Sequence, residues 1–232
     1  MEFATPLIPG TLIKRYKRFL ADVTLQDGTV VTAHCANSGS MLGVKTEGAP
    51  VWLSPSDNPK RKLKYTWELI EIDGALVGIN TSHPNAIVAE AIQAGSIAPL
   101  AGYAALRREV KYGKNSRIDI LLEDAARPPC YVEVKNVTLR RENRAEFPDA
   151  VTSRGTKHLR ELMEMVRGGS RAVMVYLVQR EDCQSFTPAA DIDPEYAATL
   201  RLAATSGVET LCYACTVTPQ AVTVTGTLPI DL

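Results

Sequence analysis

Short segments with strand patterns fill the first 80 residues of the chain. The run FLADVTLQ (19–26), the pair Asp27-Gly28 and the run TVVTAHC (29–35) are typical of a β-hairpin with a two-residue turn. Three more strands are expected at VWLS (51–54), KLKYTWELIEI (62–72) and ALVGIN (75–80). Five short strands in this length predict a small closed barrel of the OB type, with an SH3-like barrel as the alternative.

The pattern changes after residue 80, where helical and strand periods alternate. Helices are expected at 84–94, within 151–169 and at 193–206, because capping residues, prolines and glycines bound apolar positions at helical spacing. Strands are expected at 105–113, 116–123, 130–139 and 171–179, with two more at the end. The sequence therefore predicts an α/β (α+β) chain with a barrel domain over 1–82 and a mixed-sheet domain over 83–232.

Charged residues interrupt two of the apolar strands. Asp119 lies in SRIDILLE, and Glu133 and Lys135 lie in CYVEVKN. A short connection over 123–129 makes an antiparallel pair, and alternation places all three side chains on one face with Val134 in the core. In a suitable register Asp119 lies beside Glu133, with Lys135 about 6–7 Å further along.

This set of charges suits phosphodiester hydrolysis. Two carboxylates and a backbone carbonyl bind Mg²⁺ (or Mn²⁺), since these ions prefer oxygen ligands; the expected ligands are Asp119, Glu133 and Val134. A nearby lysine orients the attacking water and stabilises the developing anion. A further acid is expected from Glu90 on the first helix or Glu109 on the preceding strand. The alternative is a plain ion-pair network across two strands.

Charge is informative only locally. The chain has 26 Lys+Arg and 26 Asp+Glu, so its total charge gives no argument for nucleic acid. Between residues 10 and 65, however, nine basic residues face four acidic ones, and aromatic Tyr16 and Phe19 interleave with them. An OB-type surface uses this combination to bind phosphates and bases, although lysines also protect strand edges. The expected binding residues here are Lys14, Arg15, Lys17, Arg18, Lys60 and Arg61.

Two other segments could contact nucleic acid. The loop AHCANSGSM (33–41) offers polar groups, although a self-capped turn explains it equally. The first turns of the helix after 151 combine basic side chains with a helix N-terminus, which suits phosphate, and a histidine that could shuttle protons. That histidine could instead be a cap or a surface residue. The candidates are His34, Asn37, Ser38, Arg154, Lys157 and His158.

Cysteine usage and hydropathy indicate a cytoplasmic protein. The five cysteines are scattered, which favours a reducing compartment, and Cys212 and Cys215 have no second pair at zinc-finger spacing. The first 20 residues lack the apolar core of a signal peptide. The uncharged stretch 210–230 is rich in threonine and indicates paired strands, so no membrane partner is expected.

Several long segments resemble the sugar fermentation stimulation protein A (SfsA) family. They include LIKRYKRFLADV, RKLKYTWEL, NSRIDILL, YVEVKNVTL, FPDAVTSRGTKHLREL and IDPEYAATL, and the resemblance covers nearly the whole chain. It implies an OB-like domain, a PD-(D/E)xK restriction-endonuclease-like domain, DNA binding and a bacterial-type cytoplasmic protein. Asp119 matches the nuclease Asp, and Glu133 and Lys135 match its E-x-K. One departure is HCANSGSM, where the family usually has HCPNTGSM.

Two functions are compatible with these patterns. The first is a Mg²⁺-dependent nuclease that hydrolyses phosphodiester bonds in DNA or another nucleic acid. The second is a DNA-binding transcriptional regulator that keeps a nuclease fold without turnover, in line with the regulatory effect on sugar metabolism genes for which the family is named. A monomer and a homodimer are both compatible with the sequence.

Overall fold

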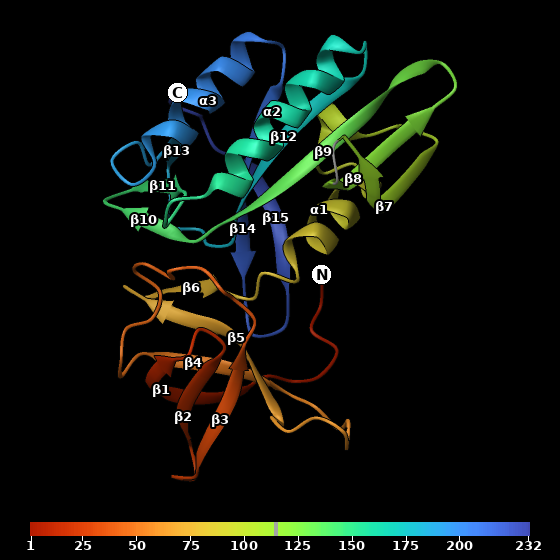
Figure 1. The fold of residues 1–232 in the computed structure, drawn as a ribbon. Helices are drawn as coiled ribbons and strands as arrows, with labels where there is room; N and C mark the ends of the chain where they lie inside the picture. The colour runs from red at the N-terminus through yellow and green to blue at the C-terminus, as the bar shows by residue number, and fades with distance from the viewer. Residues whose placement is uncertain (114–115) are drawn as a thin grey trace.

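The structure is a computed structural model that describes residues 1–113 and 116–232. The chain folds into a β-barrel and a larger mixed sheet with helices on both faces, joined at a narrow waist (Figure 1). Among the described residues, no helix is long and apolar enough to cross a membrane.

Five strands close the barrel, and a sixth extends its wall. Their order is β3-β2-β1-β4-β5-β6, and β3 also pairs with β5, which closes the circle. The strands are β1 (Ile8–Tyr16), β2 (Leu20–Leu25), β3 (Val30–Cys35), β4 (Pro50–Pro55), β5 (Tyr65–Ile72) and β6 (Ala75–Gly78). The prediction of a five-stranded OB-type barrel is confirmed.

One of the five strands that close the barrel differs from the prediction. β1 lies between β2 and β4 and was not predicted, whereas the predicted strand ALVGIN is β6 and lies outside the closed circle. Only Leu12 of β1 is fully buried, and the strand carries Lys14 and Arg15. Its pattern is therefore too polar to indicate a central strand, and its position comes from pairing on both edges.

The strand β5 is buried on both faces. Trp67 and Ile70 belong to the barrel core, whereas Leu69 packs into the core of the mixed sheet. Glu68 between them is only 5% exposed. This strand therefore joins the two bodies.

The mixed sheet has six strands in the order β15-β14-β12-β9-β8-β7. β12 is parallel to β9 and β14, and the other neighbours are antiparallel. The strands are β7 (Ala105–Tyr112), β8 (Ser116–Asp124), β9 (Arg127–Val137), β12 (Arg171–Val178), β14 (Glu209–Val217) and β15 (Val222–Thr227). The predicted combination of a mixed sheet with helices is confirmed.

Helices cover both faces of this sheet (Figure 1). α1 (Pro84–Gln93) packs on one face, and α2 (Ser153–Arg167) and α3 (Pro194–Thr205) pack on the other. The central strand β12 shows the alternation clearly, because Val173 and Val175 enter the first core whereas Met174 and Tyr176 enter the second. A short helical turn (Ala98–Leu100) precedes β7.

A small three-stranded sheet lies beside the waist. It consists of β10 (Leu139–Arg141), β11 (Arg144–Phe147) and β13 (Ser185–Pro188). The sequence predicts one strand over 130–139, but the ladder of β9 stops at Val137 and the chain leaves it to form β10. Three-residue strands carry too few positions for a recognisable alternation.

The hairpin of β8 and β9 is tighter than predicted. Its connection is two residues, since β9 starts at Arg127 and the Asp124 carboxylate accepts from the Ala126 amide at 2.9 Å. Pro128 and Pro129 are part of β9, at its exposed end before β12 begins to pair at Cys130. Proline is tolerated there because no ladder partner needs its missing N–H.

Several contacts fix the waist. The Gly78 amide donates to the Gln179 carbonyl at 2.9 Å, and the Met41 amide donates to the Asp149 carboxylate at 2.7 Å. The first residues of the chain lie against the mixed sheet, where the Met1 ammonium donates to the Val222 carbonyl at 3.0 Å.

Candidate metal centre

Glu133 and Lys135 project from the same face of the central strand β9. Glu133 is 2% exposed, and its Oε1 accepts a hydrogen bond from Lys135 Nζ at 2.7 Å. The neighbouring Val134 points the opposite way into the core under α1. A buried charge on a central strand requires a partner, and Lys135 provides one.

Asp119 reaches the same point from β8. The β8–β9 ladder pairs Ile120 with Val132, and Asp119 is the next residue along β8. Its Oδ2 accepts from the Val134 amide at 2.7 Å, and its Oδ1 accepts from the Asn85 side chain at 2.8 Å. The structure therefore brings Asp119 and Glu133 together on adjacent strands.

His158 reaches the cluster from α2 on the opposite face of the sheet from α1. Its Nδ1 contacts Glu133 Oε1 and lies 3.4 Å from Lys135 Nζ, and its side chain is almost fully buried. Arg154 Nε donates to its Nε2 at 3.4 Å. His158 therefore lies inside the centre, where it orients the Glu133 carboxylate, and is neither a surface residue nor a helix cap.

The two carboxyl groups titrate differently because their surroundings differ. Burial raises the pKa of Asp119 to about 6, and the adjacent Glu133 carboxylate adds to the rise. Burial also acts to raise the pKa of Glu133, but Lys135 and His158 outweigh it and hold this pKa below its ordinary value. Lys135 and His158 thus keep Glu133 ionised. A further positive charge would stabilise the ionised form of Asp119.

One carboxylate oxygen of the centre has no hydrogen-bond partner among the described residues. Glu133 Oε2 is buried and has no hydrogen-bond partner among residues 1–113 and 116–232. The Tyr112 hydroxyl is in the same situation, and burial together with Glu133 raises its pKa. An unsatisfied buried carboxylate oxygen beside a second carboxylate fits a hard divalent cation. No cluster of three or more His, Cys, Asp or Glu side chains with metal-site geometry occurs in the described part of the chain.

The structure distinguishes between Glu109 and Glu90, the two candidates for a further acid. The Glu109 carboxylate accepts from Asn85 at 3.1 Å, and the same Asn85 amide binds Asp119, so Glu109 lies at the edge of the centre. Glu90 is 61% exposed and pairs with the Met1 ammonium at 2.9 Å. Among the described contacts, Glu90 makes none to Asp119 or Glu133, which corrects its inclusion as an alternative acid.

Sequence reasoning missed Asn85 and Tyr112. Asn85 lies in the first turn of α1, directly after Pro84, and its amide bridges Glu109 and Asp119. Tyr112 ends β7 and its ring packs against Tyr131 at 5.7 Å between centroids. An asparagine directly after a helix-starting proline is typical of a helix cap, and a tyrosine at the end of a strand is typical of a core residue. Neither residue could therefore be assigned to the centre without the fold.

The basic hairpin of the barrel is exposed. Lys17 and Arg18 form the turn between β1 and β2 with φ values of 48° and 63°, a left-handed conformation that is costly outside glycine. Phe19 follows them, is 47% exposed, and stacks on His34 with 6.4 Å between ring centroids. Lys14 lies over the Tyr16 ring at 5.5 Å. These side chains combine cations with accessible rings.

Other predicted binding residues are engaged within the protein. Arg15 donates to the carbonyls of Asn37 and Gly39 at 2.8 and 3.0 Å. Asn37 is buried, donates to the Ile79 carbonyl, and accepts from the Gly39 amide, so the alternative of a self-capped turn describes it better. Ser38 beside it is exposed.

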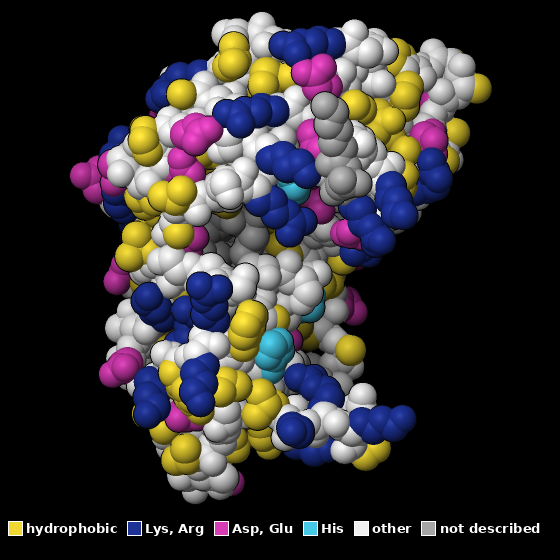
Figure 2. All heavy atoms as spheres, in the orientation of Figure 1, with side chains coloured by type: hydrophobic (Ala, Val, Ile, Leu, Met, Phe, Trp, Pro, Cys, Tyr) yellow, Lys and Arg dark blue, Asp and Glu magenta, His cyan; other side chains and the backbone are white. Residues whose placement is uncertain are grey.

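The remaining basic candidates lie on two separate surfaces. Lys60 is exposed in the β4–β5 loop, where Arg61 donates to the Thr66 hydroxyl at 2.9 Å. Arg154 and Lys157 are exposed on the first turns of α2. Figure 2 shows Lys and Arg side chains above and below the waist on one face of the molecule.

Comparison with known proteins gives a consistent result over the whole chain. The family model described as the SfsA N-terminal OB domain matches residues 13–79, and the sugar fermentation stimulation protein RE domain matches residues 82–221. Two relatives are sugar fermentation stimulation protein homologs. The one from Paramagnetospirillum magneticum is 64% identical over 100% of this chain and 98% of its own. The one from Rhodospirillum centenum is 67% identical over 100% of both.

A solved structure has the same architecture. The structure of Pyrococcus furiosus SfsA in complex with Ca²⁺ superposes with a TM-score of 0.90 and 26% identity, covering 100% of this chain and 98% of that one. The description of the N-terminal family model as an OB domain agrees with the barrel. The chain therefore belongs to the sugar fermentation stimulation protein (SfsA) family.

Proposed function

We propose that this protein is a Mg²⁺- or Mn²⁺-dependent nuclease that hydrolyses phosphodiester bonds in DNA. The observation that carries the proposal is the meeting of half-buried Asp119 and buried Glu133 on adjacent strands, with Glu133 Oε2 left without a partner among the described residues. The Ca²⁺ complex of the Pyrococcus furiosus protein supports a divalent cation, since Ca²⁺ and Mg²⁺ both take oxygen ligands.

The residues that would hold the cation are Asp119, Glu133 and the carbonyl of Val134. A cation bound there supplies an acidified water and neutralises negative charge on the phosphate. Asn85 keeps the Asp119 carboxylate in place through Oδ1, and the Val134 amide does so through Oδ2. Both carboxylates are thus held on rigid strands before a ligand arrives.

Lys135 is the proposed electrostatic catalyst. Its ammonium lies 2.7 Å from Glu133 and is 13% exposed, so it is largely shielded from water, which strengthens its interaction with a phosphate oxygen. An ammonium group has three donors, so one can hold Glu133 while another orients a water or stabilises the developing anion. His158 is a positioning residue that limits the rotation of the Glu133 carboxylate.

The proposed nucleic-acid surface joins the barrel to this centre. Phosphates would contact Lys17 and Arg18 on the barrel hairpin and Arg154 on α2, and the stacked pair of Phe19 and His34 would contact bases. The contacts of Arg15 with the loop carbonyls give it a supporting role in this surface.

A cleavage assay tests the proposal. Purified protein should cut DNA with Mg²⁺ or Mn²⁺ and not with EDTA. Glu133→Gln and Lys135→Met should each lower the rate by about 100-fold or more, because each removes a group that acts at the phosphate. Glu123→Gln and Lys111→Met change the same residue types at a partly exposed position of β8 and an exposed position of β7, and both variants should cut normally. Equal cleavage by all variants would identify a contaminating nuclease.

One observation favours a second function, a DNA-binding regulator without turnover. Three of the four oxygens of Asp119 and Glu133 already accept hydrogen bonds from the protein itself, so the cluster is nearly complete without a ligand. This function predicts DNA binding that weakens steeply with salt and no strand cutting with any metal. Lys17→Glu with Arg18→Glu should reduce the salt dependence, whereas Arg201→Glu on α3 should not.

A further inference from the structure

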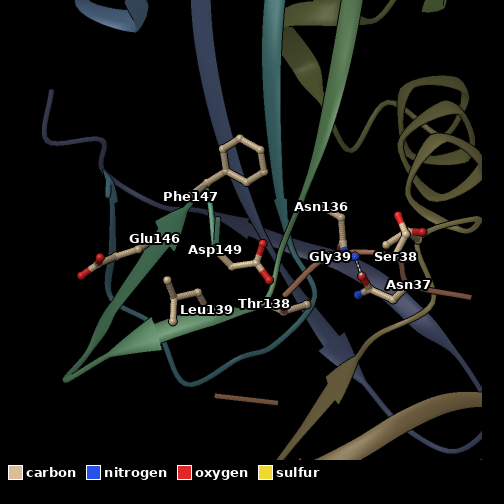
Figure 3. Close-up of a pocket in the computed structure, with 10 residues that line it drawn as sticks. Asn37, Ser38, Gly39, Asn136, Thr138, Leu139, Glu146, Phe147 and Asp149 are labelled. Carbon is tan, nitrogen blue, oxygen red and sulfur yellow. Dashed lines mark hydrogen bonds between the residues drawn. The ribbon is translucent and has the colours of Figure 1, made fainter. Parts of the chain in front are cut away.

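A polar cavity lies at the waist, separate from the carboxylate pair. It has a volume of about 270 Å³ and is lined by the loop after β3 and by the chain from the end of β9 to the start of α2. Figure 3 shows the Asp149 carboxylate pointing into this space toward Asn136 and Gly39. Its polar and apolar lining includes Asn37, Ser38, Asn136, Thr138, Leu139 and Asp149.

Two lining groups have free hydrogen-bonding capacity. Asn136 accepts from Gln179 through Oδ1, and no described residue accepts from its Nδ2. Asp149 accepts from the Met41 amide through Oδ2, and no described residue donates to its Oδ1. The cavity lining therefore offers one donor and one acceptor, the pair of groups that complements the edge of a nucleobase.

The negative charges in the cavity lining disfavour the binding of a phosphate group inside it. No Lys or Arg lines it in the described part of the chain, and the lining carries the carboxylates of Glu146 and Asp149. Its rim is basic, because Arg15 and Lys45 donate to loop carbonyls at Gly39 and Ser40. A bound polyanion would keep its phosphates on the rim and could place only an uncharged part inside.

The size of the cavity agrees with a single base. Its volume is that of about nine water molecules in the liquid, and the bonded atoms of a base lie closer together than separate waters, so one base fits with room for water. Gly39 helps to keep it open, since a Cβ there would lie 3.1 Å from Asn37 Oδ1 and 3.5 Å from both Asp149 oxygens. A paired base cannot enter, so the ligand has to be unpaired.

We infer that the waist cavity receives one unpaired nucleobase, and that this protein binds DNA with an unpaired nucleotide in preference to fully paired duplex. The inference rests on the proposed binding of DNA but requires no cleavage. The base would be read through Asn136 Nδ2 and Asp149 Oδ1, and the flanking phosphates would lie on the basic rim.

Binding measurements in EDTA test this with four probes: a fully paired duplex, the same duplex with one unpaired adenine, that duplex with an abasic residue in place of the adenine, and free deoxyadenosine. Wild type should bind the unpaired-adenine duplex about tenfold more tightly than the paired and abasic duplexes. Ser38→Trp, which fills the exposed mouth of the cavity, should lose this preference. Ser96→Trp places the same side chain at an exposed serine after α1, outside the cavity lining, and should behave as wild type.

The outcomes separate the two proposals. Equal affinity of wild type for the unpaired-adenine and abasic duplexes, or an unchanged preference in Ser38→Trp, would overturn the base site and leave DNA binding intact. Failure to bind any of the duplexes would overturn the DNA-binding proposal and the base site with it. Binding of deoxyadenosine that Ser38→Trp abolishes would support the same base chemistry with a free nucleoside as its source.

Discussion

At the scale of single residues, the centre is built at a cost to stability. The raised pKa of Asp119 means that the folded protein binds the proton of this carboxyl group more tightly than the unfolded chain does. Ionising Asp119 therefore costs the folded state free energy. The cost builds as pH rises from 3.8, the ordinary pKa, to about 6, and it is absent well below pH 3.8, where both states are protonated. Residues kept in such positions are usually functional.

Asp119→Asn should consequently remove a pH-dependent part of the stability of the metal-free protein, although it also exchanges one of the two oxygens that accept from Asn85 and Val134 for a donor. In EDTA, the free energy of unfolding of the variant relative to wild type should be about 1–2 kcal/mol more favourable at pH 7.5 than at pH 4.5, because only wild type ionises at this position. Urea denaturation at both pH values measures this. Asp124→Asn is the matched comparison, because the Ala126 amide lowers the pKa of Asp124 and its loss should destabilise. A difference between Asp119→Asn and wild type that is the same at both pH values would contradict this account.

Alternation along two strands was sufficient to predict that Asp119, Glu133 and Lys135 share a face. It could not supply Asn85 or His158, because both come from helices and their placement depends on how α1 and α2 pack on the sheet. It also could not decide between Glu90 and Glu109, since that choice depends on the N-terminal chain pairing with Glu90.

At the scale of elements, strand β5 joins the barrel to the mixed-sheet body, and the buried carboxylate of Glu68 lies at this junction. Glu68 accepts from Ser54 at 2.6 Å and Asn80 at 2.7 Å, and contacts His83 at 2.9 Å. Burial acts to raise the pKa of Glu68, but these hydrogen bonds hold it below its ordinary value. Alternation along this strand could not reveal that a second body covers the Glu68 side, since the pattern does not show what packs on a face.

Glu68→Ala should lower the free energy of unfolding by about 2–4 kcal/mol at pH 7, since it leaves the buried Asn80 without its partner. Glu71→Ala on the same strand is only partly buried and should change it by less than about 0.5 kcal/mol. The contribution of Glu68 is present above its unfolded pKa and is lost as pH falls through its lower folded pKa. A difference between the variants that persists unchanged at pH 3 would argue against this linkage.

At the scale of the whole molecule, the waist depends on close backbone approach. The Gly78 amide donates to Gln179, and a Cβ on Gly78 would lie 2.6 Å from Gln179 Oε1. Gln179 is 1% exposed and also donates to Asn136, so it has little room to move. The close approach of the barrel to the mixed sheet at this point therefore requires glycine at position 78.

Gly78→Ala should destabilise the protein by about 1–3 kcal/mol and speed proteolysis between the two bodies. Gly226→Ala is the control, because a Cβ there meets no atom within 4 Å. Thermal unfolding and limited trypsin digestion provide the two readouts. Identical behaviour of the two variants would show that the waist tolerates the added methyl group.

The central claim is that Asp119 and Glu133 form a divalent-cation site, and crystals soaked with Mn²⁺ test it most directly. The account predicts one anomalous peak about 2.1 Å from an oxygen of Asp119 and from Glu133 Oε2, absent in crystals of Glu133→Gln. No peak there, with Asp119 still bound to Asn85 and Glu133 to Lys135, would contradict it.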